Sequence, residues 1–305
     1  MRCLVTGASG HLGSALTRRL VSEGETVFAL VRPGSDLWRI ADVRDRVALI
    51  PGDLQDIEAA RPSILAAAPE TVFHLGWSGV ARGRRNDPQQ IETNVPGGLA
   101  LFAAAREAGC ATWIGVGSQA EYGVPDRVLT EDLPPRPVTS YGVAKLALGL
   151  LLAQLCDLAG MRFGWFRLLA TYGPRDDETR LIPSVIRGLL AGERPRLTGG
   201  EQRWDFLYVD DAADALYRAS QAATLSGVFN LGSGEAETVR GIVERIRDRI
   251  DPALVLGFGD VPYGPGEPMR VEADISRLRR ELGWCPAVSL DAGLGRTIDW
   301  YVRQM

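Results

Sequence analysis

The chain has 305 residues and a formal net charge of −4, from 34 basic and 38 acidic residues. This mild acidic surplus contains no concentrated basic tract, which argues against a nucleic-acid binder. Hydrophobic residues make up 46% of the chain, enough to bury a large core, and this argues against a disordered regulator. Of the basic residues 33 are arginine and one, Lys145, is lysine. Because the other basic residues are all arginine, the one lysine is a candidate for a specific role.

The N-terminal part of the chain alternates short apolar runs with segments of helical spacing, such as His11–Ser22 and Pro88–Ala108. Runs that are apolar on both faces and separated by helices require a parallel sheet covered on both sides. The predicted fold class is therefore α/β, with a doubly wound parallel sheet. The predicted strands are Cys3–Thr6, Thr26–Val31, Val47–Ile50, Thr71–Leu75, Thr112–Val116 and Arg162–Leu168.

After residue 170 the alternation becomes irregular. The patterns predict a helix over Leu181–Ala191, a strand over Val228–Leu231 and a closing helix over Leu290–Arg303. We expect residues 1–170 plus roughly 203–232 to form the cofactor-binding domain. Residues 171–202 plus 233–305 are expected to form a smaller, discontinuous C-terminal substrate lobe.

The first predicted strand follows Met1-Arg2 directly and leaves no room for a signal peptide. No apolar run reaches the roughly 18 residues of a membrane span, so we expect a cytoplasmic protein that does not bind membranes. The cysteines lie far apart and form no C-x-x-C pair, which predicts reduced, buried thiols and no metal site. They are Cys3, Cys110, Cys156 and Cys285.

A glycine-rich loop joins the first strand to the first helix, with the sequence Thr6-Gly7-Ala8-Ser9-Gly10-His11-Leu12-Gly13. Glycine is needed where the chain turns tightly and where backbone amides approach a pyrophosphate. The motif therefore predicts a dinucleotide cofactor, and the alternative is an ordinary βα turn. The expected cofactor contacts are Gly7, Ser9, Gly10, His11, Leu12 and Gly13, although loop filling is the plainer interpretation of His11.

The end of the second strand reads Val31-Arg32-Pro33 and lacks the acid that would bind the ribose 2′-hydroxyl of NAD. Arg32 can instead pair with the 2′-phosphate of NADP. NADP(H) is therefore the predicted cofactor, with NAD(H) possible, unless Arg32 is a solvated surface arginine. Asp53 and Leu54 follow the third strand as further cofactor contacts, and capping of the next turn is the alternative for Asp53.

Tyr141 and Lys145 stand four residues apart near the start of a predicted helix, which places both side chains on one face. The pKa of an unperturbed tyrosine is about 10, and a nearby ammonium in a partly desolvated cleft can lower it. Lysine carries a compact charge on a flexible side chain, so it can approach a phenolate and a ribose together, whereas the planar guanidinium of arginine is less suited to this position. This is a physical reason for a lysine at residue 145. Ser118 ends the fifth strand, at the sheet edge where ligands of open α/β folds bind.

With these motifs the chain resembles the extended short-chain dehydrogenase/reductase family, of the NAD-dependent epimerase/dehydratase type that acts on nucleotide-diphosphate sugars. The resemblance also rests on His74-Leu75, Thr93-Asn94-Val95 and Tyr172-Gly173-Pro174. It implies a Rossmann domain and a homodimer through the helices that contain Asn94 and Lys145. By matching position, the resemblance implies that Tyr141 is the catalytic acid/base and that Lys145 modulates it and contacts the ribose. Ser118 would then be the partner of the sugar oxygen. Leu75 would contact the cofactor, and Asn94 would support the cleft.

The dehydratases of this family carry an Asp-Glu pair beside the serine or threonine, and Gln119 and Ala120 stand at those positions here. The Ser-x-x-Glu-Tyr-Gly pattern at residues 118–123 is similar to that of 4-keto-6-deoxysugar reductases. The resemblance therefore implies NADPH-dependent reduction of a nucleotide-diphosphate-4-keto-6-deoxysugar, in deoxysugar biosynthesis. Glu121 either orients the substrate or is a buried carboxylate satisfied by backbone amides.

Substrate contacts are expected at Gln119 and at three arginines that match family arginines near the nucleotide or diphosphate: Arg180, Arg203 and Arg270. Trp204 separates Arg203 from the Asp-Phe pair, a departure from the family pattern, so Arg270 is the stronger candidate. A solvated surface position is the alternative for each. Trp77 either walls the sugar or packs locally. Two other functions stay open: a nucleotide-sugar 4-epimerase with tightly bound NAD, and a non-catalytic dinucleotide sensor.

Overall fold

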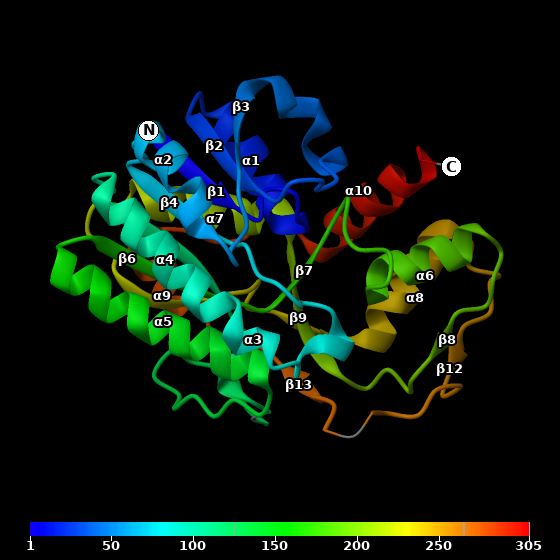
Figure 1. The fold of residues 1–305 in the computed structure, drawn as a ribbon. Coiled ribbons are helices and arrows are strands. Elements are labelled where there is room, and N and C mark those ends of the chain that lie inside the picture. The colour runs from blue at the N-terminus through cyan, green and yellow to red at the C-terminus, as the bar shows by residue number, and fades with distance from the viewer. Residues whose placement is uncertain (125, 265, 305) are drawn as a thin grey trace.

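The computed structural model describes residues 1–124, 126–264 and 266–304. Its main feature is a sheet of seven parallel strands in the order β10-β6-β5-β4-β1-β2-β3 (Figure 1). The direction of winding reverses between β1 and β4, and this is where open α/β sheets bind their ligands. The strands are β1 (Arg2–Thr6), β2 (Thr26–Val31), β3 (Val47–Pro51), β4 (Thr71–His74), β5 (Thr112–Ser118), β6 (Arg162–Leu168) and β10 (Gly227–Leu231). The predicted doubly wound fold is confirmed.

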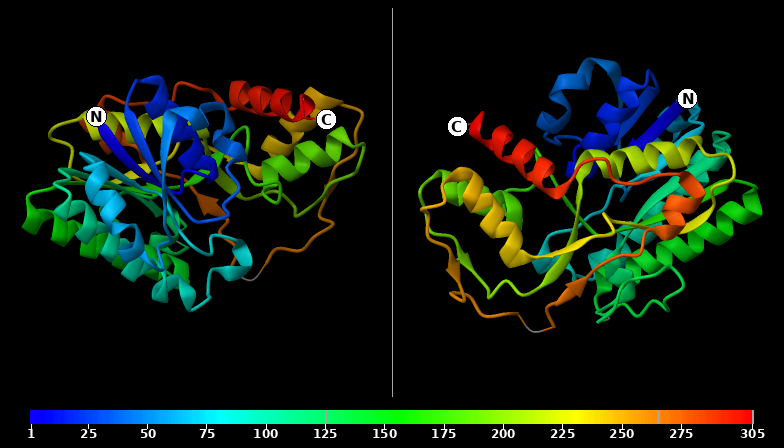
Figure 2. Two further views of the ribbon diagram at one scale, coloured as in Figure 1. Left: turned by 45° about the horizontal axis from the view of Figure 1, so that its top comes forward. Right: turned by 180° about the vertical axis from the view of Figure 1, so that it is seen from behind.

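Helices cover both faces of this sheet (Figure 2). On one face α1 (His11–Ser22) and α7 (Val209–Gln221) share a hydrophobic cluster with strand residues such as Phe73 and Phe166. On the other face α2 (Ile57–Ala67), α4 (Asn94–Glu107) and α5 (Ser140–Ala159) pack around Trp113 and Trp165. The shorter elements of this half are α3 (Gln89–Glu92) and the 3-10 helices η1 (Trp38–Arg46), η2 (Arg82–Arg84) and η3 (Gln119–Tyr122).

One helix in the described part of the chain is long and apolar enough to cross a membrane by length and composition alone. This helix is α5, with 20 residues and a mean hydropathy of 1.6, although it holds no uninterrupted apolar run of that length. A helix that covers a sheet passes the same test. Leu148, Leu152 and Cys156 of α5 are buried against the sheet, and this packing accounts for part of its apolar character.

The smaller half is built around a second sheet, in which β9 (Arg203–Tyr208) pairs with β7 (Ala170–Tyr172), β11 (Ala236–Thr238) and β13 (Arg270–Val271). A two-stranded sheet joins β8 (Arg196–Leu197) to β12 (Gly257–Phe258). The helices α6 (Leu181–Leu190), α8 (Val239–Ile250) and α10 (Leu290–Val302) share a third hydrophobic cluster. They lie to the side of the main sheet in Figure 1.

The boundary between the two halves differs from the expected one in two places. First, β9 belongs to the smaller sheet, so residues 203–208 lie outside the seven-stranded sheet. The following helix, α7, returns to the main half and covers the seven-stranded sheet. Second, α9 (Ser276–Leu282) returns to the main half, because Leu278 and Trp284 share a cluster with α1 and α7. Both differences arise from strand pairing and docking between segments far apart in the sequence.

The four cysteines are free thiols. Cys3, Cys110 and Cys156 are buried as expected, and burial raises the pKa of the Cys3 and Cys156 thiols to about 12. Cys285 is exposed, so the expectation of buried thiols is wrong there. Within the described ranges, no group of three or more His, Cys, Asp or Glu side chains is placed to hold a metal ion.

Candidate active site

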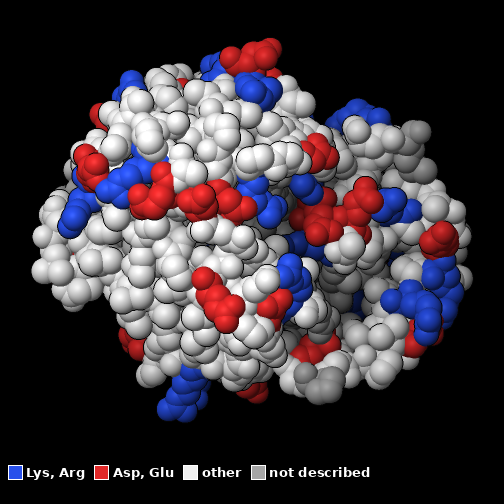
Figure 3. Space-filling model, in the orientation of Figure 1, with Lys and Arg blue, Asp and Glu red and all other residues white. Residues whose placement is uncertain are grey.

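A cleft of about 640 Å³ lies at the carboxyl ends of the central strands, between the main sheet and the smaller half. Figure 3 shows the surface hollowed between the two halves, with both basic and acidic side chains around the rim. Most residues expected at the site line this cleft: Gly7, Ser9, Gly10, His11, Leu12, Gly13, Arg32, Asp53, Leu54, Leu75, Trp77, Ser118, Gln119, Tyr141, Lys145 and Arg180. Four expected residues are outside the lining: Asn94, Glu121, Arg203 and Arg270.

The glycine loop leaves the start of α1 open to the cleft. Gly7 has a φ of +74°, and a Cβ there would lie 2.8 Å from the backbone nitrogen of Gly76. A Cβ at Gly13 would overlap the carbonyl oxygen of Gly7. Gly10 is the N-cap of α1, and no side chain caps this end. The unfilled helix start, with its positive dipole end, fits the pyrophosphate of a dinucleotide.

His11 reaches from this loop to the smaller half. Its Nδ1 lies 3.2 Å from a carboxylate oxygen of Asp176. Burial lowers the pKa of His11 to about 3, so the imidazole beside this carboxylate is neutral. Burial also raises the pKa of Asp176 to about 6, against the opposing charge of Arg180, whose Nε lies 3.5 Å from the same carboxylate oxygen. His11 thus connects the two walls of the cleft.

The end of β2 and the turn after β3 form the far end of the cleft. Arg32 is exposed there, and Asp53 and Leu54 lie across from it. The carboxylate of Asp53 accepts a hydrogen bond from the backbone of Gln55 at 3.1 Å, which is the turn-forming role given as its alternative. The position directly after β2, where an acidic residue would bind a ribose 2′-hydroxyl, is occupied by Arg32.

Ser118 and Tyr141 both line the cleft, and the Ser118 hydroxyl lies close enough to the phenol to act on its pKa. Burial raises the pKa of Tyr141, while Ser118 and the charges of Arg85 and Arg180 lower it. This differs from the expectation that Lys145 would lower the pKa of Tyr141. At neutral pH the phenol therefore carries its proton, which is the state that a general acid requires.

Lys145 is buried and its ammonium has two close contacts. Its Nζ donates to the carbonyl oxygen of Val116 at 2.7 Å and lies 3.8 Å from the centre of the Trp77 ring. Burial lowers the pKa of Lys145 to about 7, although the charge of Glu121 raises it. Near neutral pH both protonation states of this lysine are populated, so its amine can accept or release a proton.

Glu121 lies behind the cleft rather than in it. One carboxylate oxygen accepts from the backbone nitrogen of Ser118 at 2.8 Å and from the Trp165 indole at 3.0 Å. The other forms a buried ion pair with Arg167 at 2.8 Å. The expected substrate-orienting role is therefore replaced by anchoring of Ser118 from beneath. The buried-carboxylate alternative describes the geometry better, although Arg167 and Trp165 are partners that the sequence pattern did not suggest.

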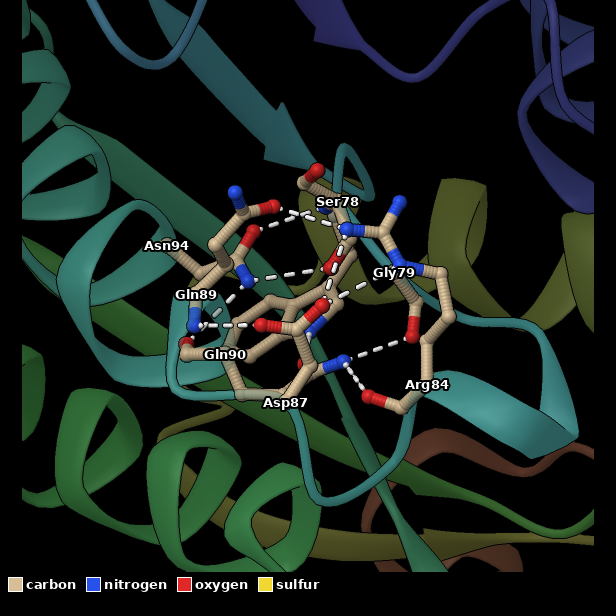
Figure 4. Close-up of polar contacts among 8 residues, drawn as sticks. Ser78, Gly79, Arg84, Asp87, Gln89, Gln90 and Asn94 are labelled. Carbon is tan, nitrogen blue, oxygen red and sulfur yellow. Dashed lines mark hydrogen bonds and ion pairs between the residues drawn. The ribbon is translucent and has the colours of Figure 1, made fainter.

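The loop after β4 is held in shape by side chains of α3 and α4 (Figure 4). Asn94 accepts from the backbone nitrogen of Ser78 at 2.7 Å and donates to its carbonyl oxygen at 3.1 Å. Gln90 accepts from the Trp77 indole at 2.7 Å and donates to the carbonyl of Gly79 at 2.6 Å. Asn94 therefore supports the loop from behind, and Trp77 forms the cleft wall between this loop and Lys145.

Arg203 and Arg270, the two arginines of the second sheet, lie outside the lining of the cleft. Arg203 is exposed and donates to the carbonyl of Ala236 at 2.7 Å. Arg270 pairs with Glu272 at 2.9 Å. Neither lines the cleft, so the expected diphosphate role finds no support in their positions. Their orientation depends on the pairing of β9 with β11 and β13, which the sequence pattern does not specify.

Sequence reasoning missed two arginines, Arg84 and Arg85, that do line the cleft. They belong to the segment Arg82-Gly83-Arg84-Arg85 in the loop after β4. A run of basic residues directly after a strand end that carries ligand contacts is a signal that points to them.

Several known proteins have sequences similar to this chain over nearly its whole length. Residues 3–232 match the NAD dependent epimerase/dehydratase family. The UDP-glucose 4-epimerase of Mycolicibacterium smegmatis is 31% identical over 99% of this chain and 98% of its own length. The dTDP-glucose 4,6-dehydratase of Streptomyces griseus is 32% identical over 98% of this chain and 93% of its own length.

The fold comparison agrees. The solved structure of MoeE5 in complex with UDP-glucuronic acid and NAD has a TM-score of 0.87 and 30% identity, and the match covers 100% of both chains. The family match spans more than half of the chain, and the fold of the solved structure matches along the whole chain. This chain therefore belongs to the NAD dependent epimerase/dehydratase family and is an enzyme of the extended short-chain dehydrogenase/reductase type.

Proposed function

We propose that this enzyme uses NADPH to reduce the 4-keto group of a nucleotide-diphosphate-4-keto-6-deoxysugar. The observation that carries the proposal is the Ser118–Tyr141 pair in the cleft, with no carboxylate beside it of the kind that a dehydratase needs. Gln119 lines the cleft, Ala120 is buried, and the carboxylate of Glu121 is occupied by Arg167. Nothing at this position is available to remove a proton from carbon 5 of the sugar, so reduction is favoured over dehydration.

The residues of the site have distinct tasks in this reaction. The bound cofactor supplies a hydride to the carbonyl carbon. Ser118 donates to the carbonyl oxygen, and Tyr141, whose pKa is raised by burial, supplies the proton as negative charge develops on that oxygen. Lys145 lines the same cleft, and because burial lowers its pKa to about 7 it can exchange a proton there near neutral pH.

The proposed preference for NADP(H) rests on Arg32 at the end of β2. Its guanidinium is exposed at the cleft, where it can form a paired hydrogen bond with a 2′-phosphate. The family is named for NAD, and MoeE5 was solved with NAD. NAD(H) is therefore the alternative cofactor that any assay must include.

A 4-epimerase is the second candidate, because the Mycolicibacterium smegmatis relative has that name. An epimerase oxidises and then reduces the same carbon, so the same serine and tyrosine would serve it. The sensor alternative is set aside, since the family consists of enzymes and Ser118, Tyr141 and Lys145 are intact.

We also propose that the enzyme is a cytoplasmic homodimer that pairs through α4 and α5. Support comes from apolar side chains on the outer face of α5, where Val143, Leu150, Leu151 and Leu158 are exposed. Such a stripe is typical of a surface that a second copy covers. Light scattering of the purified protein tests this proposal, and a monomer would contradict it.

The reductase proposal is tested by mixing purified enzyme with dTDP-, UDP- and CDP-linked 4-keto-6-deoxy sugars, with NADPH and NADH in parallel. We expect loss of NADPH absorbance with one of them, and loss of this turnover in Tyr141→Phe and Ser118→Ala. Purification with tightly bound NAD, together with interconversion of two nucleotide sugars without added cofactor, would establish the epimerase instead.

A further inference from the structure

Two neighbouring arginines in the loop after β4 have opposite environments. Arg84 donates to Asp87 at 3.0 Å and to Gln89 at 2.7 Å, so its charge is used within the loop (Figure 4). Arg85 lines the same cleft, but its Nε is buried and has no hydrogen-bond partner in the part of the chain that the structure describes. A buried guanidinium nitrogen without an acceptor is unfavourable. The unused donor therefore points to a missing acceptor.

Arg85 is held directly against the catalytic tyrosine. Its guanidinium carbon lies 5.5 Å from the centre of the Tyr141 ring. Its carbonyl oxygen accepts from the backbone nitrogen of Tyr141 at 2.8 Å, and this bond attaches the loop to the start of α5. An acceptor for Arg85 would therefore lie beside the Tyr141 side chain. On the other side of the cleft, the smaller half contributes Arg180, which is also close enough to influence Tyr141.

We propose that Arg85 is a substrate-binding residue that donates to an anionic group next to the reacting carbon, with Arg180 facing the same group from the smaller half. Guanidinium groups match phosphate and carboxylate oxygens in geometry and charge. The anion is either the phosphate attached to the sugar or a carboxylate on the sugar itself. This inference rests on the proposed function in that the substrate is a nucleotide sugar, but it concerns binding and is tested without turnover.

The test is calorimetric titration of the intact enzyme with two probes, inorganic pyrophosphate and D-glucuronate. The protein is first saturated with whichever of NAD+ and NADP+ it binds, so that the glycine loop cannot take up the pyrophosphate. We expect Arg85→Gln to weaken binding about tenfold to a hundredfold, the size expected for loss of charged hydrogen bonds. Weaker binding of pyrophosphate alone identifies the phosphate, and weaker binding of glucuronate alone identifies the carboxylate.

Arg84→Gln is the matched control, because it removes the same charge from the neighbouring position and leaves Arg85 in place. We expect its affinity for the probes to stay within about twofold of wild type, since Arg84 is engaged by Asp87 and Gln89. Arg85→Lys is the second variant in case Arg85→Gln does not fold. It keeps the charge and loses the paired donors, so we expect an intermediate loss of affinity.

Three results would overturn the inference: no binding of either probe to the wild type, equal affinity in Arg85→Gln, or an equal loss in Arg84→Gln, which would mean that the loop as a whole is disturbed. Failure of the reductase proposal has a different signature. In that case the wild type binds an anion through Arg85 but does not oxidise NADPH with any 4-keto sugar.

Discussion

Replacing Lys145 by methionine is expected to stabilise the protein without bound cofactor while abolishing catalysis. Burial lowers the pKa of Lys145 from 10.5 to about 7. At 1.36 kcal/mol per pH unit, this difference corresponds to about 4 kcal/mol of lost stability at pH 7, where half of the folded protein is still charged. Methionine has a similar volume and no charge, and it loses the hydrogen bond to Val116, worth about 1 kcal/mol. The expected net gain is about 3 kcal/mol.

The gain has a definite pH dependence. The folded pKa lies below the unfolded pKa, so wild type is destabilised progressively as the pH falls from 10.5 to about 7. Lys145→Met lacks this loss, and its advantage is therefore large at pH 7 and close to zero at pH 10. Urea unfolding of wild type and Lys145→Met at the two pH values measures the difference in their free energies of unfolding. The other titrating groups contribute equally to both proteins, so their contributions cancel in this difference.

Lys145→Arg separates charge from shape. A guanidinium keeps its charge above pH 12, so it cannot relieve the cost of burial by losing a proton. It is also larger than the site, where overpacking costs about 1 to 3 kcal/mol. We expect this variant to be less stable than wild type and inactive. The reasoning is refuted if Lys145→Met is no more stable at pH 7, or if its advantage is the same at pH 10.

Three further outcomes are expected. Glu121→Gln leaves the buried charge of Arg167 unpaired and should lower the free energy of unfolding by about 3 to 5 kcal/mol in urea titrations, and an effect below about 1 kcal/mol would contradict the anchoring role. Asp176 has a pKa of about 6 against 3.8 when unfolded, so its contribution to stability is present below pH 3.8 and is lost as the pH rises through 6. Asp176→Asn should accordingly gain up to about 3 kcal/mol at pH 8 and nothing near pH 3.5 in thermal or urea unfolding. Arg32→Ala should lower kcat/KM for NADPH about tenfold or more while leaving that for NADH nearly unchanged, and an equal effect on both cofactors would show that Arg32 does not contact a 2′-phosphate.

The local parts of this site follow from the sequence because their geometry is local. A strand followed by a glycine loop and a helix places an open helix start at the sheet edge. Ser118 and Tyr141 line the same cleft because the carboxyl end of β5 and the start of α5 both lie at the ligand-binding edge of the sheet. A spacing of four on one helix then brings Lys145 to the same cleft.

What the side chains do beyond that depends on partners far away in the chain. Glu121 is in the right segment, but Arg167 on the adjacent strand pairs with it and turns it away from the substrate. The pKa of Lys145 is set by burial, which no spacing reveals.

The doubly wound sheet, the glycine loop and the proposed catalytic residues Ser118, Tyr141 and Lys145 are recognisable without the fold, because each depends on a repeating pattern, a residue spacing or a strand end. Which arginines face the cleft depends on tertiary packing. Arg203 and Arg270 are directed away by the pairing of a small sheet, whereas Arg85 enters through a loop fixed by side chains of two helices. The orientation of a charged side chain depends on its counter-charge and on the side chains packed around it. Both come from segments that are far apart in the sequence and meet only in the folded protein.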